Sequence, residues 1–539
     1  MDWFDSWALS LAVFIPAVGA LVVMAIPRAN EDAHKLAALV TTALTLLVGI
    51  GILARFEYDQ AGTLQFGVDK SWIEVINSRY HMGLDGIALP LLILTMGITL
   101  LCIVYSWDHF PEPHNPKAFL ALILVLEVGM NGTFVAQDLI LFFIFFELVL
   151  LPMYFMIGVW GGPNREYASI KFFLFTLFGS ALMLLGFLAL FFKSDPHTFD
   201  IVTLSQMAGE GLTKGTQNII FAGLFLGFAI KVPMFPFHTW LPDAHTEAPT
   251  VGSVILAAVL LKLGTYGFIR IALPILPEAA VDWAPWIGLL AVIGIIYGAL
   301  GCLAQQDMKR LIAFSSVAHM GFTMLGISTL TSFGLNAAIF GMVAHGLITG
   351  MLFFLAGSVQ ERFHTRELSR LGGLLLQAPK LGWILGFCAM ASLGLPGLAG
   401  FWGEFPAILS AYQPADALPE ATFRTFMVIA AIGTVLAAGY LLWMLQRVAM
   451  GKIPAEWEDA HIHDVHKPEW IAWTPLLVLI LALGVYPHAI FHVTDQAVQV
   501  VSKAFPAAGD DHEAEGEGAE AGSTAGPGTG TAAESDHGD

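Results

Sequence analysis

The sequence predicts an all-α polytopic membrane protein with about fourteen transmembrane helices. Of its 539 residues, 56% are hydrophobic and only 12% are charged, which excludes an ordinary soluble protein. Apolar runs of about 20 residues, the length that crosses a bilayer, recur along the chain. The predicted spans are residues 6–26, 34–54, 86–106, 117–135, 138–160, 170–192, 218–237, 249–273, 283–303, 309–327, 331–357, 378–411, 422–447 and 470–492.

Basic residues are distributed unevenly between the predicted loops. If the N-terminus lies outside, fourteen of the 24 Lys and Arg residues fall in inward loops, eight in outward segments and two inside spans. Cytoplasmic loops carry the excess of Lys and Arg in membrane proteins, so we expect both termini outside the cytoplasm. Residues 1–7 include two aspartates and no basic residue, which is unlike the start of a cleavable signal peptide.

The last stretch, residues 506–539, contains nine acidic residues and no Lys or Arg, and it supplies −9 of the formal net charge of −19. Its Gly, Ala and Glu content predicts a disordered tail, and nothing here indicates nucleic-acid binding. Cys102, Cys302 and Cys388 lie far apart in apolar spans, and no iron–sulfur spacing, dinucleotide fingerprint or phosphate-binding loop is present. We therefore expect no cofactor in this chain.

An acidic residue lies in the middle of the fifth predicted span. Glu147 has seven or more apolar neighbours on either side. A charged group inside the bilayer must be paired, protonated or hydrated, so such residues often carry a function. A structural ion pair is the alternative role for Glu147. Glu127, in the fourth span, is a weaker candidate, because a neutral acid with a hydrogen bond would suffice there.

The seventh predicted span ends in a break. Lys231 is followed by Pro233 and Pro236, and each proline lacks an N–H and clashes with the carbonyl four residues back. A broken helix survives in a membrane only where it faces protein or a water-filled cavity. A lysine near the centre of a span costs about 2.5–3.5 kcal/mol, which favours a function. The alternative is a lysine at the membrane edge that reaches water.

Three further ionisable residues lie in the following spans. Lys262 lies deep in the eighth span, and a second lysine inside the membrane weakens the membrane-edge interpretation of Lys231. His319 lies in the tenth span, four residues after Ser315 and on the same helix face, and His345 lies in the eleventh. A single histidine among apolar residues is usually a hydrogen-bonded core residue. Two histidines in successive spans favour a proton relay and a structural core role about equally.

The twelfth span repeats the pattern of the seventh. Pro396 and several glycines interrupt it, and Glu404 follows. Two halves, each with a polar helix and then a broken helix two spans later, are typical of a transporter built from internal repeats. The sequence therefore predicts breaks beside Lys231 and Glu404, each facing a cavity.

Long motifs of this chain resemble the antiporter-like membrane subunits of complex I, the NADH:quinone oxidoreductase. The motifs are Phe145-Phe-Glu-Leu-Val-Leu-Leu-Pro-Met-Tyr154, Ala229-Ile-Lys-Val-Pro-Met234, Leu241-Pro-Asp-Ala-His-Thr-Glu-Ala-Pro-Thr250, Lys262 and the run from Lys309 to Phe322. The resemblance covers about residues 82–487. Within the family the chain is most similar to subunit M of the bacterial enzymes, the counterpart of mitochondrial NADH dehydrogenase subunit 4. That branch has a glutamate at the twelfth-span position, where sibling subunits usually have lysine.

The resemblance implies fourteen core helices with two inverted five-helix repeats, spans four to eight and nine to thirteen, in which helices 7 and 12 are discontinuous. Residues 1–116 then form the first three helices with an external hairpin. Residues 117–273 form the first repeat, residues 283–447 the second, and residues 448–505 the last helix.

The resemblance also implies proton translocation in a bacterial inner-membrane complex, driven by electron transfer in other subunits. Glu147 and Lys231 are expected to form the input-side pair, Lys262 to be the bridging lysine and Glu404 the exit-side acid. The two histidines are expected to join the central polar axis. FMN, iron–sulfur clusters and quinone are expected in partner subunits, and sibling antiporter-like subunits and membrane lipids are expected around this chain.

Two alternative functions remain open from the sequence. The chain could belong to a multi-subunit Na⁺/H⁺ antiporter, or it could be a structural subunit that binds its neighbours and moves nothing. The roles of Glu127, His238, His245 and the acidic tail are also left open.

Overall fold

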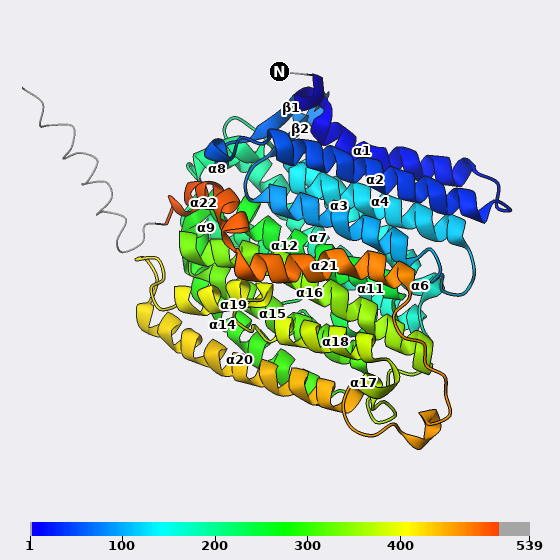
Figure 1. Cartoon of the computed structure of the whole chain (residues 1–539). Helices are drawn as coiled ribbons and strands as arrows, with labels where there is room; N and C mark the ends of the chain where they lie inside the picture. The colour runs from blue at the N-terminus through cyan, green and yellow to red at the C-terminus, as the bar shows by residue number, and fades with distance from the viewer. Residues whose placement is uncertain (1–2, 506–539) are drawn as a thin grey trace, which may run out of the picture.

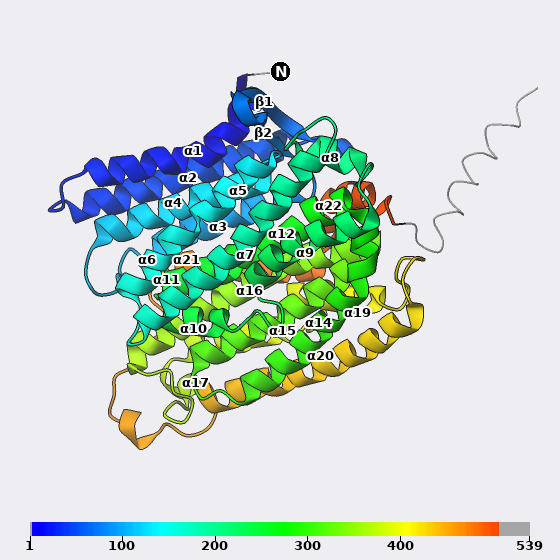
Figure 2. The ribbon, with the colours of Figure 1, turned by 180° about the vertical axis from the view of Figure 1, so that it is seen from behind.

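Long helices run side by side through the molecule (Figures 1 and 2). The computed structural model describes residues 3–505, and the predicted disordered tail at residues 506–539 lies outside the described residues. Within residues 3–505, twelve helices are long and apolar enough to cross a membrane. The two remaining predicted spans, the seventh and the twelfth, are the interrupted ones. The predicted all-α membrane fold is therefore confirmed.

The N-terminal part contains three long helices and a two-stranded antiparallel hairpin. Its elements are α1 (Trp3–Ala25), α2 (Glu31–Arg55), η1 (Tyr58–Gln60), β1 (Gln65–Ile73), η2 (Glu74–Ile76), β2 (Ser78–Leu84) and α3 (Ala88–Tyr105). Asp138, just before the fifth span, accepts hydrogen bonds from the Ser78 hydroxyl and the Arg79 N–H. These bonds fix the hairpin to the helix bundle.

The next part holds the first interrupted span. Its elements are α4 (Pro116–Val135), α5 (Leu139–Leu148), α6 (Leu150–Trp160), α7 (Arg165–Lys193), α8 (Ile201–Met207), α9 (Lys214–Lys231), α10 (Trp240–Glu247), α11 (Thr250–Ile255), η3 (Leu256–Leu260), α12 (Leu261–Gly267), η4 (Phe268–Ala272) and α13 (Leu273–Ile275). One detail differs from the sequence-based expectation. The fifth predicted span, residues 138–160, is divided at Val149.

The remaining part holds the second interrupted span. Its elements are α14 (Pro277–Leu303), α15 (Met308–Ser328), α16 (Ser332–Phe363), α17 (Leu374–Gln377), α18 (Pro379–Ser392), α19 (Ala399–Ser410), α20 (Glu420–Val448), η5 (Ala455–Trp457), α21 (Lys467–Val485) and α22 (His488–Ser502). The last span ends at Val485, earlier than predicted, because Pro487 lacks the N–H that would continue it. The separate helix α22 follows.

Side-chain caps start several of these helices. Asn115, Asp138, Asp307 and Thr331 each accept a hydrogen bond from a backbone N–H in the first turn of the helix that follows. Such caps satisfy N–H groups that have no partner inside the helix. They define where α4, α5, α15 and α16 begin.

Three spans form the centre of the molecule. The span from α11 to α13 is wholly buried along its most hydrophobic stretch, and α15 and α16 are almost wholly buried, whereas α2, α7, α20 and α21 expose most of theirs. Because lipid is as apolar as a protein interior, the polar residues of the three central spans must find partners within the protein. Lys262, His319 and His345 all belong to these spans.

Both ends of the described chain lie at the same end of the bundle, near the hairpin and α22 (Figure 1). The loop between α1 and α2 lies at the other end, where Lys117 at the start of α4 donates to the Ile26 carbonyl. A chain whose two ends lie at the same end of the bundle crosses the membrane an even number of times. Which end faces the cytoplasm stays a prediction from the Lys and Arg distribution.

A buried ion pair joins α16 to α21 and gives a first testable prediction. Arg362 makes two contacts of 2.7 and 2.8 Å with Glu469, whose side chain is 0% exposed. Removing one partner of such a pair costs about 3–5 kcal/mol, because the other charge is left buried. We expect Glu469→Ala to lower the thermal unfolding midpoint of the purified protein by several degrees. Glu456→Ala, which breaks an exposed pair with Arg370, should change it little; equal shifts in the two variants would contradict this.

Candidate functional site

Glu147 lies where the fifth span bends. The helix α5 ends one residue after it, and α6 restarts at Leu150. Pro152 explains the bend, because its ring clashes with the carbonyl of Leu148 four residues back. The Glu147 side chain is partly buried, and Ser180 of α7 is the hydroxyl residue within its reach. An acid at a helix bend inside a bundle can shift position without breaking a continuous helix.

Lys231 is the last residue of α9 and is 3% exposed. The chain then leaves helical geometry until Trp240, as the two prolines predicted. The freed carbonyls of this break have partners. The Ala229 carbonyl accepts from the Met234 N–H at 2.9 Å, and the Ile230 carbonyl accepts from the Trp240 indole at 2.9 Å. The break is therefore held by its own hydrogen bonds. The lysine at its edge lies inside the protein rather than at the membrane edge.

Glu147 and Lys231 lie close together but are not in direct contact. The Lys231 ammonium lies 4.9 Å from the centroid of the Phe146 ring, next to Glu147 in the chain. Glu147 is the acid close enough to act on Lys231 electrostatically. Within residues 3–505, no nitrogen–oxygen distance of 4.0 Å or less joins Lys231 to a carboxylate. The cation–π contact stabilises the ammonium while leaving it free to respond to the acid.

Lys262 lies between two π-helical segments, η3 and η4, and is 0% exposed. Its ammonium donates to the Ala257 carbonyl at 2.5 Å, and it lies 2.7 Å from Nδ1 of His345. A π-helical turn widens the helix by one residue and is frequent at functional sites. No carboxylate pairs with Lys262 among the described residues, so its nearest proton acceptor is a histidine.

A line of contacts continues from His345 to Glu404. The ring centroids of His345 and His319 are 6.0 Å apart. His319 contacts Oε1 of Glu404 through Nδ1 at 2.5 Å, and its other nitrogen, Nε2, lies 3.1 Å from both the Ser392 and the Tyr440 hydroxyls. The structure thus brings together Lys262, both predicted histidines and the predicted exit-side acid.

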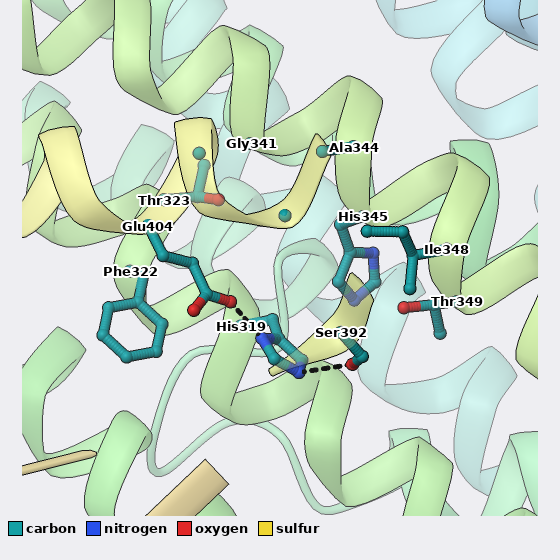
Figure 3. Close-up of a pocket in the computed structure, with 12 residues that line it drawn as sticks. His319, Phe322, Thr323, Gly341, Ala344, His345, Ile348, Thr349, Ser392 and Glu404 are labelled. Atoms are coloured by element: carbon teal, nitrogen blue, oxygen red, sulfur yellow. Dashed lines mark hydrogen bonds and ion pairs between the residues drawn. The ribbon is translucent and has the colours of Figure 1, made fainter. Parts of the chain in front are cut away.

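The two histidines and Glu404 line one cavity, and their side chains point into it (Figure 3). The volume open to the centre of a water molecule is about 20 Å³, which is enough for one water. Nε2 of His345 and Oε2 of Glu404 have no hydrogen-bond partner among the described residues. A polar cavity of this size, with unpaired donors and acceptors on its wall, can hold a hydrogen-bonded water between the rings.

The second break shapes this cavity. Between α18 and α19 the chain passes through Gly394 with φ of +80°, a left-handed conformation that favours glycine. Helix α19 then packs against α16 at two glycines, since a Cβ added to Gly403 would lie 2.4 Å from the Cα of Gly341. This close approach holds Glu404 against His319.

Several polar partners were not singled out from the sequence. Ser392 lies beside the glycine-rich break, which was a usable signal, and Ser180 lies in α7, where Ser169 and Thr176 are further hydroxyl residues. Tyr440 of α20 is fully buried and faces His319, but no local pattern marks it. Its role follows only from the packing of α20 against α15.

Three polar residues stay outside the line of contacts. Both oxygens of Glu127 are buried without a hydrogen-bond partner among the described residues, so the structure gives no hydrogen bond for the alternative of a neutral, hydrogen-bonded acid. His245 of α10 is 0% exposed and stacks on Phe353 at 4.5 Å, and both its ring nitrogens lack a partner within the described chain. His238 stacks on Phe235 beside the first break.

Comparison with known proteins identifies the family. The family model described as NADH:quinone oxidoreductase/Mrp antiporter, TM, matches residues 136–438. "NADH-quinone oxidoreductase subunit M" of Rickettsia prowazekii is 40% identical over 91% of this chain and 98% of its own length. The chain belongs to the subunit M family of NADH-quinone oxidoreductases. Subunit M of Rhodobacter capsulatus is 41% identical over 89% of this chain and 93% of its own length.

Solved structures agree with membership of the subunit M family. A chain of respiratory complex I from Thermus thermophilus matches with a TM-score of 0.82 and 29% identity, over 92% of this chain and 99% of that chain. A chain of the Mrp complex from Dietzia sp. matches with a TM-score of 0.79 over 94% of this chain and 99% of that chain, but it is only 19% identical. The second likeness shows a shared fold alone.

Proposed function

We propose that this chain translocates protons across the membrane as a subunit of an NADH:quinone oxidoreductase. The observation that carries the proposal is the line of contacts from Lys262 through His345 and His319 to Glu404. It runs through the three most buried spans and ends at a broken helix. Membership of the subunit M family supports the same function. A structural subunit would have no need for four ionisable groups along its axis, since each is costly in lipid.

The geometry suggests the order of proton steps. The Lys262 ammonium can pass a proton to Nδ1 of His345 along the 2.7 Å contact, provided that this nitrogen is the unprotonated one. Nε2 of His345 faces the cavity, and a water there can carry the proton to His319. His319 then delivers it to Glu404 along the 2.5 Å contact. Ser392 and Tyr440 orient the ring of His319.

Glu147 and Lys231 act on the input side of this line. A carboxylate near a buried lysine stabilises the ammonium form, and moving or neutralising the carboxylate removes that support. Because Glu147 lies at a helix bend, a small displacement changes its distance from Lys231. Moving one charge against the membrane potential costs about 2.3 kcal/mol per 100 mV. A tenfold change in the proton affinity of a group is worth about 1.4 kcal/mol, so this coupling supplies a useful part of the cycle.

Electron transfer would take place elsewhere in the assembly. FMN, iron–sulfur clusters and quinone would be held by partner subunits, and sibling antiporter-like subunits would flank this chain. It would span a bacterial inner membrane with both termini outside the cytoplasm, as the Lys and Arg distribution predicts. The position of both described ends at one end of the bundle fits two termini on the same side of the membrane.

Substitutions of Glu404 test the proposal. Glu404→Ala and Glu404→Gln should reduce NADH-driven proton pumping about tenfold or more, because a positioned proton-transfer group typically contributes at least that much. Glu404→Asp and Glu404→Lys should retain more activity, since both keep an ionisable side chain at the cavity. The measurement is proton uptake by inverted membrane vesicles, normalised to the amount of assembled complex.

The control for Glu404 is Glu420→Ala. Glu420 is an exposed acid at the start of α20, and it pairs with Arg424 of the same helix. This variant should pump like the wild type. If the alanine form of residue 404 also pumps like the wild type, Glu404 is not the exit-side acid.

A further inference from the structure

A large cavity lies at the end of the bundle opposite the hairpin. It has a volume of about 610 Å³ and lies between α2 and α6, with the first turns of α4 as its floor. Arg28, His34, His114 and Lys117 line it, together with Glu31. Three helix ends meet here, since α2 and α4 begin and α6 ends at this level. Such a position lies at the boundary between the bilayer and water.

The charges on the cavity wall do not balance. Glu31 is the acid on the wall, and it is already paired with Lys35 at 2.8 Å and with His114 at 3.0 Å. Lys117 donates to the Ile26 carbonyl at 2.7 Å and has no carboxylate partner within residues 3–505. Arg28 is exposed and makes no hydrogen bond or ion pair among the described residues. Two cations with unused N–H donors therefore face the same space.

The wall on the lipid side is apolar. Leu122, Phe155 and Val159 line the cavity on this side, and Trp160 at the end of α6 lines it as well. Phe155 is 43% exposed and Val159 is 37% exposed, so this wall continues onto the membrane-facing surface. The Trp160 indole donates to the Pro113 carbonyl at 2.9 Å, as is common for tryptophan at a membrane–water interface.

We propose that this cavity binds an anionic phospholipid. Arg28 and Lys117 would hold the phosphodiester, and an acyl chain would lie along Leu122, Phe155 and Val159. Basic pockets between transmembrane helices on the cytoplasmic side bind acidic head groups in this way. A neutral phospholipid would gain less, because its own positive head group would face the two cations. A free phosphate would leave the apolar wall exposed.

Site-specific photo-cross-linking in the intact complex tests the lipid site. A photoreactive benzoylphenylalanine replaces Phe155, and the complex is reconstituted in vesicles of equal parts phosphatidylglycerol and phosphatidylcholine. Mass spectrometry then quantifies the lipid adducts on this chain. We expect the phosphatidylglycerol adduct to exceed the phosphatidylcholine adduct on the order of tenfold, because each cation near the surface strengthens anionic-lipid binding several-fold. Adding Arg28→Gln should remove most of this preference, and adding Lys117→Gln should remove the rest.

Matched controls keep the lipid test specific. Lys452→Gln removes an exposed cation outside the cavity and should leave the preference unchanged. The same photoreactive residue at Phe178, which is 62% exposed on α7, should show no preference that depends on Arg28. Equal adducts of the two lipids at Phe155 would overturn the proposal, as would a preference that survives both glutamine variants. Loss of the adduct on addition of inorganic phosphate, or an adduct with a protein subunit in its place, would overturn it too.

Discussion

Arginine in place of Lys231 is expected to give a complex that assembles but pumps protons at least about ten times more slowly than the wild type. Arginine keeps the positive charge and the cation–π partner but is not deprotonated in proteins. A lysine that carries a proton must cycle through its neutral form. The burial of Lys231, which is 3% exposed, makes that form accessible because desolvation disfavours the charged form. Lys231→Ala is expected to fail as well, because Glu147 then loses its cation. NADH-driven proton uptake into inverted vesicles, normalised to assembled complex, measures both.

The control for these variants is Lys214→Arg at the exposed start of the same helix, where Lys214 pairs with Asp282 at 2.9 Å. An ion pair at the surface tolerates arginine, so this variant should pump normally. Wild-type pumping by the arginine form of residue 231 would show that Lys231 is a fixed counter-charge. The carrier would then have to be Lys262 or a histidine.

Glu147→Gln is expected to reduce proton pumping and the coupled quinone reduction about tenfold or more, while the fold is retained. Glutamine has nearly the same shape, but it cannot stabilise the Lys231 ammonium by charge. The electrostatic coupling between residue 147 and Lys231 is then lost. Quinone reduction and proton uptake are both measured, because loss of coupling slows them together.

Glu166→Gln, an exposed acid in the first turn of α7, is the matched control and should have no effect. Near-normal pumping by an assembled Glu147→Gln complex would refute the role of Glu147. A complex that fails to assemble would instead point to a structural ion pair, which is the alternative derived from the sequence.

The sequence was sufficient to predict the fold because hydrophobicity and helix breakers act locally. Apolar runs located the spans, and Pro233, Pro236 and Pro396 located the two interruptions. Proline acts on the carbonyl four residues back whatever the tertiary structure, so these two predictions needed no knowledge of packing. The bend at Val149 was missed although Pro152 marks it, because a single proline is also tolerated inside a transmembrane helix.

The contacts of the candidate site needed the structure. The π-helical segments beside Lys262 have no sequence signature, and their geometry depends on the neighbours of the helix. Tyr440 reaches His319 across more than a hundred residues of chain, so no local pattern could pair them. Residue type identified Glu147, Lys231, Lys262, His319, His345 and Glu404 as candidates. Only the packing shows that four of them form a line while the other two stand apart from it.

The narrowness of the passage between Lys262 and His319 has a consequence for ion selectivity. A sodium ion enters a protein only where oxygen atoms replace its hydration shell. The Lys262 ammonium has one carbonyl oxygen and one ring nitrogen as neighbours, and the cavity beyond has room for about one water. A hydrated metal cation does not fit there and is repelled by the ammonium, whereas a proton needs only a hydrogen bond at each step. A chain of an Mrp complex shares this fold. If the proposed line of contacts carries the ion, we expect this chain to exclude hydrated metal cations and to pass only protons.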